Sequence, residues 1–314
     1  MMEEIMAGIT KNDQVILLSA HEDLQDGRFN QVVNKSEHLL EKYPKMLEIN
    51  DLYASALYNL KKFSEAYKVI QEFQNDFITN PQYQSDGLKI FLANDLFMAA
   101  REVLAHTSAD KHQQRQAVIL QNEDAYRQQH SNDLSKQTRR LAHLGSLPVY
   151  EQVHEITVSQ KLPLKEYVLA AKTLLNDPFG WQVSKTQVLL QLMKVKFSEN
   201  IQLYWLDGKS HTISIDELKP LDEYQSFVAV LKKVTEQFES EDPIKLDLVE
   251  KELFTQSNYI FPYFDEVITI PKFWAETVIA QSFGGTASAD SPEEERMLAW
   301  IKLIHDQEIK IGLI

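Results

Sequence analysis

Hydrophobic positions in the first third of the chain recur at helical spacing. Tyr67, Ile70 and Phe73 form one such stripe, with the three- to four-residue steps that mark the buried side of an amphipathic helix. A single helix of this kind cannot bury its stripe alone. The pattern therefore predicts pairs of helices, each pair stacked on the next.

The pattern has a period of 34 residues. Phe29, Phe63 and Phe97 coincide in register. The positions two residues before the aromatics, where turns are expected, are Gly27, Lys61 and Asp95. The positions three residues after the aromatics carry slim side chains: Val32, Ala66 and Ala100. This spacing resembles the tetratricopeptide repeat, whose unit is two antiparallel helices. The resemblance covers residues 12–110 and implies three repeats, with the aromatics as packing between them.

The resemblance also implies a binding surface. In this family the first helices of the repeats line a concave groove that holds a peptide. The corresponding positions here are Leu17, His21, Leu24 and Gln25, then Asp51, Ser55, Tyr58 and Asn59, then Ser85, Lys89 and Leu92. Leu24, Tyr58 and Leu92 align as an apolar strip suited to a helical or extended peptide, or else they pack between repeats. Members that bind chaperone tails use a Lys/Asn/Arg clamp. Leu17 and Asp51 stand where a clamp lysine could, so an acidic tail is not the expected partner.

Residues 111–180 are predicted to form one long exposed helix over Asp110–His143 and a degenerate helical pair over Pro148–Ser159 and Pro163–Leu175. The long helix carries a basic patch, Lys136, Arg139 and Arg140, at a spacing that places all three on one helix face. Such a patch either docks an acidic segment or is simply a solvated face.

Residues 181–314 are predicted to form a helical domain with one β-hairpin near 200–215. The alternation there favours a three-residue loop, Leu206–Gly208, with Gly208 in the left-handed conformation. That odd loop length places five apolar residues on one face: Ile201, Leu203, Trp205, Ile213 and Ile215. Val267–Ile270 is a candidate third strand. The fold class is thus mostly α: stacked helical hairpins followed by a helical domain with one hairpin.

Charge and composition narrow the possible partners. The chain has 46 Asp and Glu against 32 Lys and Arg, a formal net charge of −14, which disfavours nucleic acid as a partner. No apolar run approaches the roughly 18 residues that a membrane span needs. The N-terminus lacks the basic residues of a secretory signal, and the absence of cysteine suits a reducing compartment. We expect a cytoplasmic protein.

Motifs for catalysis are not found. There is no His-Glu-x-x-His zinc motif and no Gly-x-Ser-x-Gly nucleophile motif, and Gly284-Gly285-Thr286 lacks the phosphate-loop frame and is interpreted as a linker. We therefore expect no enzyme activity, cofactor or metal.

The expected function is a protein–protein interaction scaffold that binds a protein or peptide. The alternative is a repeat scaffold carrying a catalytic or ligand-sensing C-terminal domain, which a pocket of converging ionisable groups with shifted pKa values would favour. The arrangement, with the stretch Ser184–Leu190 before the hairpin, also resembles tetratricopeptide-repeat proteins of Gram-positive, lactic acid type bacteria.

Overall fold

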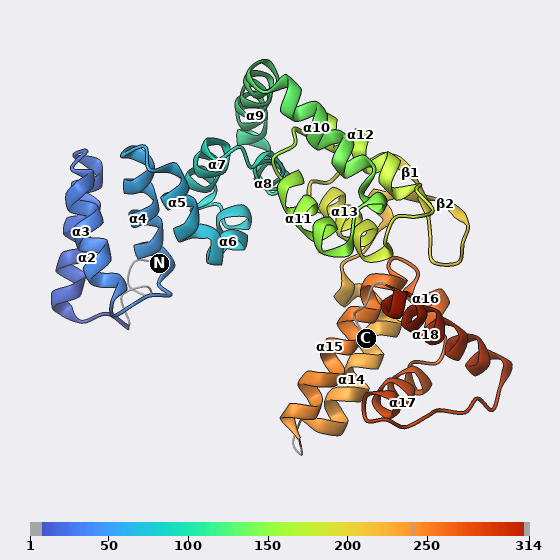
Figure 1. Cartoon of the computed structure of the whole chain (residues 1–314). Helices are drawn as coiled ribbons and strands as arrows, with labels where there is room; N and C mark the ends of the chain where they lie inside the picture. Colours follow the sequence, from blue (N-terminus) through green and yellow to red (C-terminus); the bar gives the residue numbers. More distant parts are fainter. Residues whose placement is uncertain (1–7, 240–241, 311–314) are drawn as a thin grey trace. The chain divides into compact units, whose positions relative to one another are not determined.

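The computed structural model describes residues 8–239 and 242–310. The chain is mostly α-helical and has one antiparallel β-hairpin (Figure 1). It divides into two compact units. The first comprises residues 1–137 and 158–167, and the second comprises residues 138–157 and 168–314. Among the described residues, no helix combines the length and the apolar character that crossing a membrane requires.

The first unit is built from helical hairpins. Its helices are α2 (Lys11–Gln25), α3 (Phe29–Leu40), α4 (Leu47–Asn59), α5 (Phe63–Ile70), α6 (Gln74–Thr79), α7 (Gln84–Ala93), α8 (Phe97–Ala105) and α9 (Ala109–Gln129), with a 3-10 turn η2 (Gln71–Phe73) between α5 and α6. Helix α2 packs beside α3, α3 beside α4, and α4 beside α5 (Figure 1). The expectation of stacked helical hairpins is confirmed.

The same backbone turn ends the first helix of each hairpin. Gly27, Lys61 and Asp95 have left-handed φ angles of 74°, 62° and 59°. After each of them, a backbone N–H reaches back five residues to a helix carbonyl: Arg28 to Asp23 at 2.8 Å, Lys62 to Leu57 at 2.9 Å and Leu96 to Phe91 at 2.9 Å. This is the hydrogen bond of a Schellman cap. The 34-residue period of the sequence is therefore a period of the backbone.

Small side chains allow the paired helices to approach closely. Ala20, Ala54 and Ala66 are all fully buried. The predicted role of the aromatics holds for Phe97, which is 1% exposed, but is wrong for Phe63, which is 36% exposed. Phe63 lies against the ring of Tyr58, with the ring centroids 5.4 Å apart, and so covers the turn of its own hairpin.

A glycine permits the close packing of α6 against α7. A Cβ atom added to Gly87 would lie 2.7 Å from the carbonyl oxygen of Phe77, closer than real Cβ contacts allow. Phe77 itself is fully buried. Gly87 is therefore required by the approach of two backbones.

The prediction of one long helix over Asp110–His143 is wrong. Helix α9 ends at Gln129 and α10 (Ser131–Ala142) begins two residues later. Between them, His130 leaves the helical conformation, with φ −124° and ψ 29°, and its ring lies 4.6 Å from that of Tyr126. Helices α11 (Val149–Ser159) and α12 (Leu164–Leu175) follow and match the predicted helical pair.

The hairpin has the predicted register. Strand β1 (Asn200–Tyr204) pairs with β2 (Ser210–Ser214) so that Ile201 faces Ile213. The Trp205 N–H donates to the Lys209 carbonyl at 2.9 Å, which leaves a three-residue loop in which Gly208 has a φ of 75°. The five apolar residues predicted to share a face are all buried: Ile201, Leu203, Trp205, Ile213 and Ile215.

A buried lysine joins the hairpin to α13 (Gln182–Lys194). Lys185 is 1% exposed, and its Nζ donates to the carbonyl of Tyr204 at 2.6 Å. Burial lowers the pKa of Lys185 to about 8. A polar bond therefore ties the end of the first strand to this helix.

The rest of the second unit is helical. Its elements are the 3-10 turns η3 (Leu144–Ser146), η4 (Ile215–Glu217) and η5 (Leu221–Glu223), and the helices α14 (Gln225–Phe238), α15 (Pro243–Ile260), α16 (Phe264–Val267), α17 (Pro271–Ser282) and α18 (Pro292–Lys310). The strand predicted at Val267–Ile270 is wrong, because α16 occupies its start and Pro271 begins the next helix. Trp274, which is fully buried, donates its indole N–H to Gln256 and anchors α17 to α15.

Replacing Gly208 by valine should destabilise the second unit. A β-branched residue at a left-handed φ is unfavourable by about 1 to 2 kcal/mol, so we expect a loss of that size. All four tryptophans, residues 181, 205, 274 and 300, belong to this unit, and urea unfolding followed by tryptophan fluorescence measures the loss. Gly208→Asn, which tolerates this conformation, is the control and should lose less than half as much. Equal losses in the two variants would contradict the role given to Gly208.

Candidate functional site

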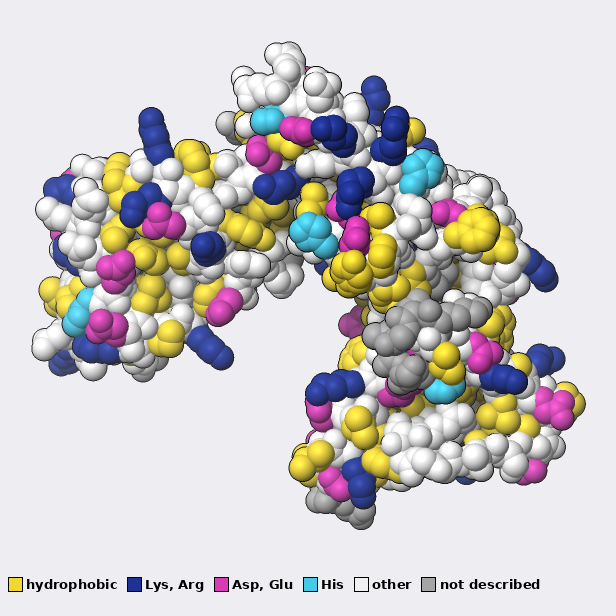
Figure 2. All heavy atoms as spheres, in the orientation of Figure 1, with side chains coloured by type: hydrophobic (Ala, Val, Ile, Leu, Met, Phe, Trp, Pro, Cys, Tyr) yellow, Lys and Arg dark blue, Asp and Glu magenta, His cyan; other side chains and the backbone are white. Residues whose placement is uncertain are grey.

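The first helices of the three hairpins meet in the first unit. Helix α4 contacts both α2 and α7. We call the surface they share the first-helix face, and define it by the polar residues His21, Glu48, Asp51, Ser55, Asp86 and Lys89. On the side of the first unit that Figure 2 shows, acidic and basic side chains are interspersed with hydrophobic ones.

Most polar groups of the first-helix face are paired. The Nε2 of His21 lies 2.8 Å from Oε1 of Glu48 and joins α2 to α4. The Nζ of Lys89 donates to Oδ1 of Asp86 at 2.7 Å. Two buried atoms are not paired: Oδ1 of Asp51 and Oγ of Ser55 find no hydrogen-bond partner in the described part of the chain. These residues stand four apart, so they lie on one side of α4.

The unpaired Asp51 carboxyl has a shifted pKa. Burial raises the pKa of Asp51 to about 7, and the nearby carboxylates of Asp86 and Glu48 add to the rise, while His21 and Lys89 oppose it. Near neutral pH this carboxyl is therefore poised to ionise once a positive group approaches it.

Two predicted contact residues belong to the core instead. Leu17 is 2% exposed and Leu92 is 9% exposed, because each lies on the side of its helix that packs against the paired helix. Leu24 is half-buried against the N-terminal core cluster, and Tyr58 is half-buried against Phe63. The packing alternative therefore holds for Leu92, whereas Leu24 and Tyr58 keep part of their side chains accessible.

The remaining predicted residues are polar and accessible. Gln25, Asn59 and Ser85 are exposed. The Nδ2 of Asn59 donates to the carbonyl of Ser55 at 2.7 Å. The first-helix face is consequently polar and acidic, with partly buried aromatic and aliphatic neighbours.

The predicted basic patch lies on α10 and is partly neutralised. The Nη2 of Arg140 lies 2.8 Å from Oε1 of Glu155 and 3.6 Å from Oε2 of Glu151. Lys136 and Arg139 are exposed. Because Arg140 is already paired twice with carboxylates, the patch offers an acidic segment less charge than its sequence indicates.

The Asp51 carboxyl should make stability depend on pH. Its pKa in the folded protein, about 7, lies above the ordinary value of 3.8 for an aspartate, so its contribution to folding is complete below pH 4 and is lost as the pH rises through 7. We expect Asp51→Asn to match the wild type in stability at pH 4. At pH 8 it should be more stable by about 1 to 3 kcal/mol, because asparagine places no charge at this buried position.

Hydrogen exchange of amides in α4 and α7 measures this difference, since the first unit contains no tryptophan. Glu72→Gln, at an exposed acid on η2, is the control and should change little. A variant less stable than the wild type at pH 8 would contradict the unpaired state of Asp51.

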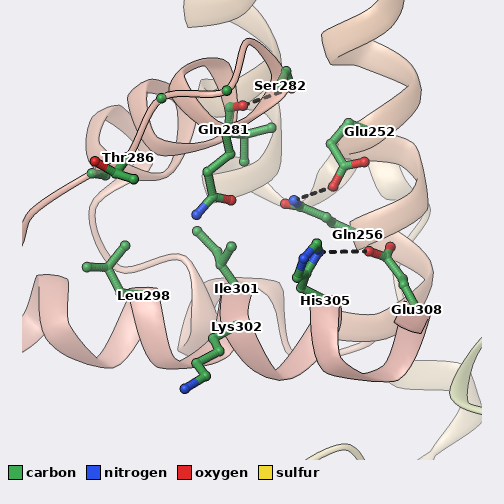
Figure 3. A pocket seen from close by; sticks show the side chains of 14 residues that line it. Glu252, Gln256, Gln281, Ser282, Thr286, Leu298, Ile301, Lys302, His305 and Glu308 are labelled. Atoms are coloured by element: carbon green, nitrogen blue, oxygen red, sulfur yellow. Dashed lines mark hydrogen bonds and ion pairs between the residues drawn. The ribbon is translucent and has the colours of Figure 1, made fainter. Parts of the chain in front are cut away.

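A second candidate site lies in the second unit. A cavity of about 600 Å³ is lined by α15, α17, α18 and the 284–287 loop. Figure 3 shows Glu252 and Gln256 on one side of it and Ile301, His305 and Glu308 on another.

Glu308 is the buried ionisable group of this cavity. It is 5% exposed, and its Oε1 has no hydrogen-bond partner among the described residues. Burial, with a smaller effect from Glu252, raises the pKa of Glu308 to about 7. Its other oxygen lies 3.9 Å from Nδ1 of His305, whose side chain is 59% exposed.

The hydrophobic pattern of the last helix indicates that Glu308 is buried, although no sequence motif contains this residue. Met297, Ile301 and Ile304 form the buried stripe of α18, and Glu308 is the next position in that stripe. A carboxylate where the helical period expects an apolar residue marks a buried charge. The 284–287 segment, interpreted above as a linker, is one wall of the cavity.

No protein-family model, curated protein or solved structure matches the chain. Among the described residues, no group of three or more His, Cys, Asp or Glu side chains is placed to hold a metal ion.

Proposed function

We propose that the N-terminal repeats form a tetratricopeptide-like array that binds a protein segment through the first-helix face. The segment would place a lysine or arginine side chain beside Asp51. The observation that carries the proposal is the unpaired, buried Oδ1 of Asp51, with the unpaired Oγ of Ser55 one helical turn away.

The fold leaves the buried Oδ1 of Asp51 and Oγ of Ser55 without hydrogen-bond partners among the described residues. A buried polar group without a partner lowers stability, and proteins retain such groups where function requires them. The carboxyls of Glu48, Asp51 and Asp86 give the first-helix face an acidic character, and Lys89 is already held by Asp86. A basic side chain supplies both the missing donor and the opposite charge.

The half-buried Tyr58 and Leu24 are proposed to contribute apolar contacts at the edge of the same binding surface. Each keeps part of its side chain accessible beside the first-helix face, and aromatic side chains at such edges often contribute strongly to binding. The segment would therefore combine a basic residue with an apolar neighbour.

Selection from a random peptide-display library on the full-length protein tests the proposal. We expect enriched peptides to share a Lys or Arg at one fixed position, and Asp51→Asn to lose them. Enrichment of acidic or purely apolar peptides, or of peptides that Asp51→Asn retains, would contradict it.

The alternative function, ligand sensing by the C-terminal half, is supported by the cavity with its buried Glu308. Both functions can belong to one chain, because they use residues of different units.

A further inference from the structure

The cavity of the second unit is large enough for a small organic molecule. Its volume of about 600 Å³ lies within the range usual for ligand sites. Apolar walls come from Val278, Leu298 and Ile301, and the last two point into the space (Figure 3). An aliphatic body would be held there.

The charges of the cavity favour a cation. Glu252 and Glu308 line it, and Oε1 of Glu308 is buried without a partner in the described ranges. Glu252 accepts a hydrogen bond from the side-chain amide of Gln256 at 2.8 Å. Lys302 is exposed and points away from the space (Figure 3). A ligand with a positive head would thus satisfy an acceptor that the protein leaves open.

The backbone at the cavity points to the same ligand charge. Helix α17 ends at Ser282 on the cavity wall, and a helix C-terminus carries partial negative charge. The two glycine amides that would have to cradle a phosphate are already used: Gly284 donates to Gln281 at 3.1 Å and Gly285 to Ala280 at 2.8 Å. These two amides are therefore not free to bind an anionic ligand.

We propose that this cavity binds a small organic cation, with an amine or guanidinium head between Glu308 and Glu252 and an aliphatic body against Ile301, Leu298 and Val278. The site specifies the ligand class for the C-terminal half and does not depend on the repeats binding a protein.

Isothermal titration of the full-length protein with agmatine tests the site, with hexanoate as the anionic probe of similar length. We expect saturable binding of agmatine with a dissociation constant below about 1 mM and no binding of hexanoate. Glu308→Gln should weaken agmatine binding at least tenfold. This variant keeps the side-chain volume and removes a buried charge, so it should remain folded. Arg296→Gln, at an exposed arginine of α18 outside the cavity lining, is the matched control and should bind as the wild type does.

Binding should also weaken as the pH falls from 7.5 to 5.5, because Glu308 must be ionised to pair with the head. The ionisable groups that face it are Glu252 and Tyr259 on α15 and His305 on α18. His305→Ala should keep this pH dependence if Glu308 is its source.

Three results would overturn the proposal: no saturable binding of agmatine, equal binding by wild type and Glu308→Gln, or tighter binding of a blocked Ala-Lys-Ala peptide than of agmatine. None of them bears on the peptide selection against the repeats, which uses the other unit.

Discussion

Replacing Arg101 by methionine should lower the stability of the first unit by about 3 to 5 kcal/mol, the penalty of leaving one member of a buried ion pair alone. Arg101 on α8 donates from Nε and Nη2 to both carboxylate oxygens of Glu123 on α9, at 2.9 and 2.8 Å. Glu123 is only 1% exposed. Without Arg101 it keeps the Leu164 N–H at 3.3 Å and a distant Arg127 at 3.7 Å.

The double variant Arg101→Met with Glu123→Met separates lost pairing from lost packing. Replacing both members of a buried pair by apolar residues is often neutral, so the double variant should regain most of the loss. Hydrogen exchange of α8 and α9 amides provides the measurement. A single variant that loses less than about 1 kcal/mol, or a double variant no more stable than the single one, would show that the pair is not what holds these helices.

Reversing the charge of Asp51 should remove peptide binding by the first-helix face. Truncating one partner of a buried, hydrogen-bonded charge pair costs about 2 to 5 kcal/mol, which is about thirtyfold in affinity at the lower end. For Asp51→Lys we expect at least that loss for a selected basic peptide, measured by fluorescence anisotropy. Glu72→Lys, at an exposed acid, makes the same change of net charge and should bind within about twofold of the wild type.

A charge-swap experiment distinguishes loss of the contact from misfolding of the Asp51→Lys variant. A peptide with glutamate in place of its basic residue should bind Asp51→Lys more tightly than it binds the wild type. Asp51→Asn, expected to be the more stable protein at pH 8, should also lose binding. If Asp51→Lys binds the basic peptide as the wild type does, the acid is not the contact.

The sequence predicted those parts of the fold that local geometry determines. Left-handed turns recur at Gly27, Lys61 and Asp95 because each ends the first helix of a hairpin with the same capping hydrogen bond. The hairpin register followed from parity, since only an odd loop before Lys209 puts Ile201 and Ile213 on one face.

Other parts depend on contacts that periodicity does not specify. Nothing local distinguishes Phe63, which is exposed, from Phe97, which is buried. No Gly or Pro stands near His130 to indicate the helix break there. The ion pair between Arg101 and Glu123 joins residues 22 positions apart, and its burial depends on which helices meet.

The sequence names residues of the candidate site, but it does not show which of them are buried or unpaired. Asp51 and Ser55 were expected to face a partner, and they carry the unpaired atoms of the face. Leu17 and Leu92 were expected beside them, but they are core residues. An apolar residue at a helix surface position and one at a packing position look alike in sequence, whereas an unpaired buried carboxyl is visible only in three dimensions.

Hydrogen-exchange mapping of a selected basic peptide on the full-length protein tests the central claim most directly. The account predicts new protection within α2, α4 and α7, strongest near Asp51, and none in residues 182–310. Protection confined to residues 182–310, or to the second helices α3, α5 and α8, would contradict it.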